Sequence, residues 1–340
     1  MGSHRRLVPS GFDRGASAAL CVMSAAAAAL GAVPATTAVA APADDTRAEV
    51  DRLYEEAEKA TEAYNKADER ADALRKQVGG AQDRIARQQE RINTMREALG
   101  SLAGAQYRSG GLDPSLALLF SDDPDDYLDK AAALDRLTAH QAGELKDLQG
   151  AMRELAQERA EATRKLGELE KSRKAVASHK RTVESKLARA RQLLNSLPST
   201  ERDAYDRASR SGRSDLPDLG SAAPSSGRAA AAVAAARSAV GKPYVWGANG
   251  PNGFDCSGLM QWSYAQAGVS LPRTSQGQRY AGRQVPLAQA QPGDLVTYRG
   301  DASHVGMYMG NGQVVHAPYP GAPVRYDPVG MMPGATVTRV

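Results

Sequence analysis

The sequence predicts an α+β protein, in which a long antiparallel α-helical coiled-coil hairpin precedes a small domain with an antiparallel sheet. Residues 44–198 place apolar or small side chains in a 3-4 alternation, which is the spacing of a coiled-coil seam. Residues 228–340 contain short strand-like runs between glycine turns and one helix that starts at a cysteine. A chain of 340 residues is long enough for both parts and a leader.

Residues 1–40 have the order of a secretory signal peptide. Basic residues up to Arg14 are followed by an uncharged stretch from Gly15 to Val33 and the small-residue cleavage signal Ala38-Val39-Ala40. A membrane anchor is the alternative, but the apolar run is mostly alanine and ends at Pro34. We therefore expect export across the cytoplasmic membrane, by a route (general secretory or twin-arginine) that the sequence leaves open.

The coiled-coil segment divides into two arms around a breaker. The first seam runs from Val50 to Leu102 and the second from Leu134 to Leu197, where Pro198 ends it. The glycines and prolines between the arms interrupt any continuous helix and favour an antiparallel hairpin within one chain. A parallel dimer of two helices is the alternative that the seams allow.

The predicted tip of the hairpin carries a compact apolar cluster. Its members are Leu116, Leu118, Leu119 and Phe120. Such a cluster either packs on the arms or forms a docking site for another protein, and the sequence favours neither. After the second arm, residues 199–227 are rich in Ser, Asp, Arg, Pro and Gly without periodicity, which predicts a flexible linker.

Cys256 is the strongest candidate for chemistry in the chain. The only other cysteine, Cys21, lies in the predicted leader, so the exported protein would carry one thiol into an oxidising space. Cys256 precedes a predicted helix that ends at Gly268. The free N–H groups and dipole of a helix N-terminus stabilise a thiolate and could also bind an oxyanion. A small buried hydrophobe is the plainer interpretation of a cysteine.

Two downstream histidines favour the catalytic interpretation. His304 and His316 fall on two predicted strands around Gly310-Asn311-Gly312, so His304 could act as the base of the thiol and His316 could orient it. A clean two-residue turn would place the two imidazoles on opposite faces of the sheet. A shared site therefore requires an odd loop or a bulge, and we predict one of these.

The composition excludes several other functions. A net charge of +4 and a pI near 9.0 suit an anionic surface, but no basic, aromatic-interleaved stretch indicates nucleic-acid binding. Cys256, His304 and His316 could instead bind zinc, yet clustered cysteines or a histidine pair at helical spacing are absent from the sequence. We therefore predict neither a metal nor a cofactor.

Six motifs in order resemble the NlpC family of papain-like bacterial cell-wall endopeptidases. They are Tyr244-Val245-Trp246-Gly247, Asp255-Cys256-Ser257-Gly258, Leu271-Pro272-Arg273, Pro292-Gly293-Asp294-Leu295, His304-Val305-Gly306-Met307-Tyr308 and Val315-His316-Ala317. The resemblance covers residues 228–340. It implies a papain-like domain that cleaves peptidoglycan stem peptides, typically between D-glutamate and the diamino acid.

The resemblance also assigns roles to individual residues. It implies Cys256 as nucleophile, His304 as base and His316 as the third polar residue, a position where some members have another side chain. Tyr244 matches a family tyrosine that helps to hold the oxyanion. Asp255 and Ser257, which flank the nucleophile, are expected to contact the oxyanion or the substrate.

The helical region shows a weaker resemblance to the hairpin tips of coiled-coil cell-wall hydrolases. It rests on Gly111-Leu112-Asp113-Pro114 through Ser121-Asp122-Asp123-Pro124, then Tyr127-Leu128. In those proteins the coiled coil restrains or positions the peptidase, and a membrane complex can relieve the restraint. The competing interpretations are a non-catalytic scaffold that binds wall peptide, and a thiol amidase or transferase acting on another amide.

Overall fold

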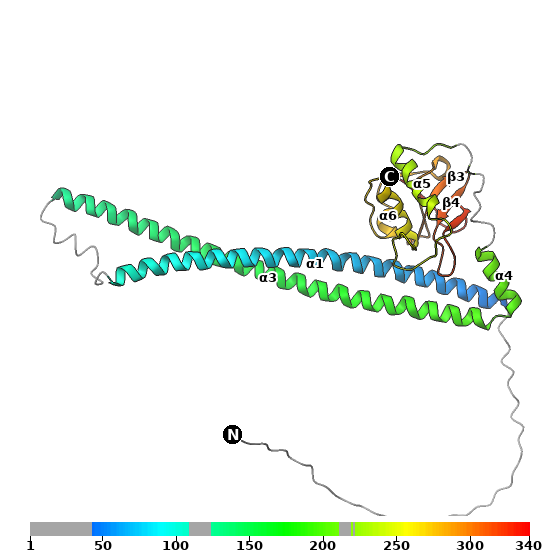
Figure 1. Cartoon of the computed structure of the whole chain (residues 1–340), viewed down its shortest axis with the longest axis horizontal. Helices are drawn as coiled ribbons and strands as arrows, with labels where there is room; N and C mark the ends of the chain where they lie inside the picture. Colours follow the sequence, from blue (N-terminus) through cyan, green and yellow to red (C-terminus); the bar gives the residue numbers. More distant parts are fainter. Residues whose placement is uncertain (1–42, 109–123, 211–218, 220–221) are drawn as a thin grey trace, which may run out of the picture. The chain divides into compact units, whose positions relative to one another are not determined.

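The computed structural model describes residues 43–108, 124–210, 219 and 222–340, and its α+β class agrees with the sequence. Two long helices, α1 (Ala43–Arg108) and α3 (Pro124–Ser196), form the N-terminal hairpin. They lie side by side in Figure 1, α1 in blue to cyan and α3 in cyan to green. The predicted leader, with Cys21, and the apolar tip lie outside the described residues.

Cross-helix contacts show that α1 and α3 run antiparallel. Glu56 pairs with Lys186, whereas Gln88, much further along α1, donates to Glu154 at 3.0 Å. Because the partner number falls along α3 as the residue number rises along α1, the helices have opposite directions. The antiparallel hairpin predicted from the sequence is therefore confirmed.

The predicted seam of α1 is largely its buried face. The seam residues that are buried against α3 or neighbouring side chains include Val50, Leu53, Ala57, Ala60, Ala71, Leu74, Val78, Ala81 and Ile92. The seam of α3 is less complete, because Leu145, Met152 and Leu166 remain about half exposed. The small alanines among these positions allow the two backbones to approach closely.

Part of the predicted flexible linker is helical. Helix α4 (Ser199–Arg210) follows α3 almost directly, and Tyr205 packs near the hairpin core. Further along, Leu219 is buried in the core of the C-terminal domain. The expectation of an unstructured stretch over 199–227 was therefore wrong for these residues, because Tyr205 and Leu219 find apolar surfaces that only the folded protein provides.

The C-terminal domain packs helices against one antiparallel sheet. Its elements are α5 (Gly227–Ser238), α6 (Cys256–Gln266), α7 (Ser275–Gln278), β1 (Arg283–Val285), a 3₁₀ turn (Leu287–Gln289), β2 (Leu295–Tyr298), β3 (His304–Gly310), β4 (Gln313–His316), β5 (Arg325–Pro328) and β6 (Thr336–Arg339). The strand order is β1-β6-β2-β3-β4-β5, with every pair antiparallel.

The main core of this domain lies between α5, α6 and one face of the sheet. It includes Ala232 and Ala236 from α5, Leu259 and Met260 from α6, and Val305 from β3. The alanines let α5 approach α6 closely, so that α6 is fixed against β3. This packing holds the N-terminus of α6 next to the start of β3, where two candidate catalytic residues lie. Among the described residues, no helix combines the length and apolarity needed to cross a membrane.

Candidate active site

Cys256 occupies the first position of α6, as the sequence predicts. Asp255 is the N-cap, and its carboxylate accepts a hydrogen bond of 2.6 Å from the Gly258 N–H. This cap sets where the helix begins and therefore orients the Cys256 side chain. The thiol is unpaired and buried, with 2% of the residue exposed.

A β-bulge places His304 and His316 on the same face of the sheet. Met307 pairs with Val315 and Tyr308 with Val314, but the register then shifts before the Asn311-Gly312 turn. Because of this shift, Gly306 lies opposite His316. His304, two residues before Gly306, then faces the same side, and the predicted bulge is confirmed.

The two imidazoles are in direct contact within a buried relay. His304 Nε2 and His316 Nδ1 lie 2.7 Å apart, and the rings meet edge to face. His316 Nε2 lies 2.8 Å from Asp327 Oδ2 on β5. Arg325 donates to the same carboxylate oxygen at 2.8 Å. Sequence analysis did not identify Asp327, because a single aspartate on a short strand carries no motif.

Charge and burial fix the protonation of the outer part of this relay. Hydrogen bonds from His316 and Arg325 outweigh the effect of burial on Asp327 and lower its pKa to about 2. Burial lowers the pKa of His316 to about 4, despite the contact with Asp327. Asp327 is therefore ionised and His316 is neutral at physiological pH.

The other predicted site residues surround Cys256. Tyr244 is buried beside the thiol, and burial followed by the charge of Cys256 raises the pKa of its phenol. Asp255 forms a two-pronged ion pair with Arg273, with N···O distances of 3.0 and 2.6 Å. Ser257 accepts a 2.9 Å hydrogen bond from Arg273. Asp255 thus has a structural role as cap and ion-pair partner, in addition to any contact with substrate.

A second buried stripe of α1 is polar and covers this site. Glu58, Thr61, Glu62 and Asn65 have exposed fractions of 2–3% and recur at the three- and four-residue spacing of one helical face. Their burial could not be predicted from the sequence, because glutamate on a solvated helix face and glutamate in a buried polar contact follow the same pattern.

Glu58 engages the proposed base directly. Its Oε1 lies 2.7 Å from His304 Nδ1, and its Oε2 accepts a 2.8 Å hydrogen bond from Arg299. Burial opposes ionisation of Glu58, but the charges of His304 and Arg299 outweigh it and lower the pKa. Glu58 is therefore a carboxylate that occupies the one ring nitrogen of His304 not used by His316.

Glu62 engages the groups next to the nucleophile. Its Oε1 accepts hydrogen bonds from Ser257 Oγ at 2.7 Å and from the Cys256 thiol at 3.7 Å. Its Oε2 accepts a 2.8 Å hydrogen bond from the Ser275 N–H. One turn further along α1, Asn65 donates to Asp255 at 3.1 Å. The α1 stripe thus contacts the nucleophile, the base and both residues that flank the nucleophile.

The inserted carboxylates change the chemistry of the thiol. Burial, and then the charges of Glu62, Glu58 and Asp255, raise the pKa of Cys256 well above its ordinary value. Burial and the charge of Asp255 raise the pKa of Glu62 itself to about 7. The thiol beneath α1 is therefore protonated at neutral pH.

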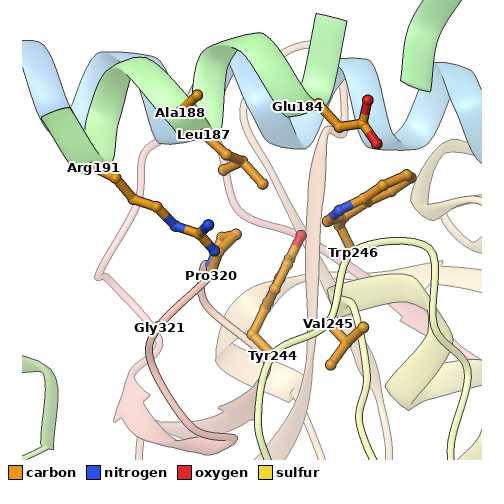
Figure 2. A pocket seen from close by; sticks show the side chains of 9 residues that line it. All are labelled: Glu184, Leu187, Ala188, Arg191, Tyr244, Val245, Trp246, Pro320 and Gly321. Atoms are coloured by element: carbon orange, nitrogen blue, oxygen red, sulfur yellow. The ribbon is translucent and has the colours of Figure 1, made fainter. Parts of the chain in front are cut away.

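Openings remain beside the covered site. A pocket of about 390 Å³ lies between α3 and the C-terminal domain; in Figure 2, Leu187 and Arg191 of α3 face Tyr244 and Pro320. A second pocket of about 570 Å³ is lined by Glu62 on α1 and by loop residues of the domain. Concave surface thus borders Tyr244 and Glu62, two residues that lie next to the thiol.

A possible set of metal ligands is formed by Glu58, Cys256 and His304. Each offers an atom within 4.8 Å of the others. However, Glu58 Oε1 and His304 Nδ1 are 2.7 Å apart. Two ligands at tetrahedral zinc would stand roughly 3.3 Å apart, given metal–ligand bonds of about 2 Å. These atoms are better described as a hydrogen-bonded ion pair than as a metal centre.

Residues 241–333 match the model of the NlpC/P60 family. The C-terminal domain belongs to the NlpC/P60 family. The resemblance inferred from the six motifs is thus confirmed, and the match spans α6, β3 and β4 with the Cys256, His304 and His316 positions.

Two curated relatives are named as probable endopeptidases. One from Mycobacterium tuberculosis is 50% identical over 99 residues, which are 29% of this chain and 26% of that protein. One from Corynebacterium glutamicum is 46% identical over 118 residues, 35% of this chain and 56% of that protein. The chain thus spans only about a quarter to a half of the length of these relatives.

Two solved structures are similar to about a third of this chain. The NlpC/p60 domain of the peptidoglycan hydrolase SagA is 37% identical, with 33% of this chain and 98% of that chain covered and a TM-score of 0.31. The peptidoglycan hydrolase RipB from Mycobacterium tuberculosis is 38% identical, with 33% and 64% covered and a TM-score of 0.30.

Proposed function

We propose that this protein is an exported peptidoglycan endopeptidase that hydrolyses stem-peptide amide bonds, between D-glutamate and the diamino acid. The observation that carries the proposal is the contact of His304 with His316 beside the Cys256 thiol, within an NlpC/P60 domain. The names of the relatives supply the class of reaction. The leader predicted from the sequence supplies the location, outside the cytoplasmic membrane and in the cell wall.

The mechanism is acyl transfer through a thioester. His304 Nδ1 takes the proton of Cys256, and the thiolate attacks the amide carbonyl. The N–H at the start of α6 and the Tyr244 hydroxyl stabilise the oxyanion. Protonated His304 then donates its proton to the leaving amine as the C–N bond breaks. Water, deprotonated by His304, attacks the thioester and releases the acid together with the Cys256 thiol.

We further propose that α1 holds the peptidase in an inactive state. Asp327 only accepts, so His316 Nε2 donates to it, and the remaining His316 Nδ1 accepts from His304 Nε2–H. Glu58 also only accepts, so His304 Nδ1 must donate as well. His304 therefore carries both protons as long as Glu58 is bound, and a doubly protonated imidazole cannot act as a base.

The steric contribution of α1 is independent of this proton. With α1 bound, Cys256 is only 2% exposed and its thiol faces Glu62. A substrate amide must approach the sulfur to within roughly 3–3.5 Å before attack. Turnover therefore requires α1 to leave the groove, and hydrolysis should depend on whatever withdraws the hairpin.

The test uses a chain in which the inserted carboxylates are removed. We define the open variant as Glu58→Ala with Glu62→Ala, and the control as Glu90→Ala, an exposed glutamate further along the same helix. Purified muropeptides are incubated with each protein and the products are identified by mass spectrometry. We expect the open variant to cleave at least about tenfold faster than wild type and control. This ratio corresponds to a loss of about 1.4 kcal/mol from the free energy that favours the closed state.

Adding Cys256→Ala to the open variant should abolish cleavage. Continued cleavage would remove Cys256 from the mechanism. Equal rates for the wild type and the open variant would contradict inhibition by α1. Muropeptide binding by the open variant without any cleavage would contradict the peptidase and favour the wall-binding scaffold. Cleavage of a different amide would favour the thiol amidase or transferase.

A further inference from the structure

The catalytic relay continues one residue beyond His316, to a carboxylate that no motif identified. Asp327 lies on β5, next to β4, and is only 4% exposed. Its Oδ2 accepts hydrogen bonds from His316 Nε2 at 2.8 Å and from Arg325 Nε at 2.8 Å. The carboxylate is therefore held between a fixed cation and the third member of the proposed triad.

A neutral imidazole has one N–H donor and one acceptor nitrogen, so if one ring nitrogen donates a hydrogen bond, the other must accept one. The Asp327 carboxylate can only accept, which places the His316 proton on Nε2 and leaves Nδ1 as an acceptor. His316 Nδ1 lies 2.7 Å from His304 Nε2, which must then donate. With its Nε2 protonated, a neutral His304 has its lone pair on Nδ1, the nitrogen on the side of Glu58 and Cys256.

Without this constraint the relay could take the opposite direction. His316 with its proton on Nδ1 would donate to His304 Nε2, and His304 would then carry its proton on Nδ1. In that form His304 offers no lone pair to the Cys256 thiol, so it could not serve as a base. His316 alone does not decide between the two directions, because an imidazole can present either nitrogen as the donor.

We propose that Asp327 is a positioning residue for the thiol-peptidase reaction: it fixes the tautomer of His316 and, through it, directs the lone pair of His304 towards Cys256. The inference rests on the proposed function, because it assigns Asp327 to that reaction. It names four residues in series, Cys256, His304, His316 and Asp327, with Arg325 holding the last one in place.

A purely structural role makes a different prediction, and the domain offers a matched control. Asp294 is also buried in the same domain and is also paired with an arginine, Arg339, at 2.7 Å. No imidazole is paired with Asp294 among the described residues. If Asp327 only neutralised Arg325, then Asp327→Asn and Asp294→Asn should have comparable effects on both stability and turnover.

The kinetic test measures turnover of muropeptides in the open variant. Asp327→Asn should lower kcat by roughly 100-fold or more with little change in KM, because loss of the orienting carboxylate leaves the wrong tautomer. Asp294→Asn should leave kcat within about threefold. In a His316→Gln background the glutamine oxygen accepts directly from His304, so adding Asp327→Asn should change kcat by less than about threefold.

A loss of similar size in both backgrounds would overturn the proposal, since Asp327 would then not act through His316. Unchanged kcat for Asp327→Asn in the open variant would overturn it as well. Thermal unfolding of each variant separates a folding defect from a catalytic one, because a folded variant with full stability and low kcat cannot be explained by loss of structure.

A spectroscopic measurement keeps the inference independent of the proposed function. Nitrogen-15 spectra of histidine-labelled full-length protein that carries Glu58→Ala, Glu62→Ala and Cys256→Ala report which ring nitrogen of His316 carries the proton. We expect Nε2 in this protein and a shift towards Nδ1 after Asp327→Asn. A proton on Nδ1 before the substitution overturns the inference even if the protein is a peptidase. An inactive open variant with Nε2 protonated refutes the proposed function alone.

Discussion

At the residue scale, His304 has both ring nitrogens engaged by different parts of the chain. His316, from the adjacent strand, takes Nε2, and Glu58, from the distant helix α1, takes Nδ1. In the proposed mechanism, the first contact prepares the imidazole for catalysis and the second blocks it. A single carboxylate can therefore switch the base off without disturbing the strands that position it.

Glu62 makes the docking of α1 dependent on pH. Bound α1 raises the pKa of Glu62 from an ordinary 4.5 to about 7, because burial and Asp255 disfavour its charge more than Ser257, the Ser275 N–H and Arg273 favour it. At a pH between 4.5 and about 7, the Glu62 carboxyl keeps its proton when α1 is docked and loses it when α1 is free. Docking is thus strongest at the acidic end of this window and weakens as pH rises to 7, by at most about 3 kcal/mol.

A dye-pair measurement checks this sign. Dyes placed on cysteines at the exposed positions Ser178 and Tyr280 report the distance between α3 and the C-terminal domain, with Cys21→Ser and Cys256→Ala removing the native thiols. Between pH 5 and 7.5 we expect the open population to rise with pH, and to rise less steeply after Glu62→Gln. Closure with rising pH would contradict the assignment. Glu58 has the opposite effect below about pH 4.5, where a free Glu58 takes up a proton but the docked Glu58, whose pKa is lowered, keeps its charge, so docking weakens as pH falls.

At the scale of single elements, the β3–β4 hairpin determines whether the two histidines meet. The bulge before the turn places the side chains of His304 and His316 on the same face of the sheet, and Gly306 leaves room for His316 on the facing strand. A Cβ at Gly306 would lie 3.1 Å from the Val315 carbonyl oxygen and 3.2 Å from the His316 Cβ. Both distances are tighter than ordinary packing, so a side chain at this position would have to displace Val315 or His316 by a few tenths of an ångström.

Substituting this glycine should damage the site more than the fold. Gly306→Ala is expected to cost about 1–3 kcal/mol of unfolding free energy through overpacking, and to lower kcat of the open variant by at least about tenfold as His316 shifts. Calorimetry and muropeptide turnover measure the two effects. Gly300→Ala is the control, because a Cβ there has no neighbour within 4 Å. A loss of stability without any loss of kcat would contradict the positional role of Gly306.

At the scale of the whole described chain, the hairpin is attached to the C-terminal domain by a second contact away from the thiol. Tyr319, in the loop after β4, stacks on Tyr54 of α1 with ring centres 5.0 Å apart and lies 6.4 Å from Tyr205 of α4. Tyr205 also contacts Asp51 at 3.4 Å. The aromatic contact attaches the hairpin to the domain and adjoins the proposed relay, because Arg325, which donates to Asp327, lies 5.5 Å from the Tyr319 ring centre.

Weakening this contact should release activity. Tyr205→Ala removes one ring of the aromatic contact. It should lower the free energy that favours the closed state by about 1 kcal/mol, since aromatic pairs contribute about 0.5–1.5 kcal/mol beyond area burial. We expect roughly fivefold faster muropeptide cleavage by otherwise wild-type protein, equivalent to that free energy. Tyr127→Ala, at a half-exposed position on α3 away from the domain, should have no effect. Unchanged cleavage after Tyr205→Ala would place closure entirely in the α1 stripe.

The sequence by itself determined the parts of this protein that depend on local order. The 3-4 seam predicts α1 and α3, the run that ends at Gly268 predicts a helix that begins near Cys256, and a shared site for His304 and His316 requires an odd loop or a bulge. Each is a short-range pattern that the backbone obeys whatever surrounds it. These patterns also sufficed to identify the family and the three residues of the proposed triad.

Only the tertiary structure decided which polar residues lie in the site. Asp327 reaches His316 because β5 pairs with β4, and Glu58 and Glu62 reach the site because α1 packs across it. Nothing in their local sequence separates them from solvated carboxylates, since burial of a charge depends on what the fold places above it. The sequence thus determined the proposed nucleophile and its proposed base, whereas the packing of a distant helix decided that both are covered.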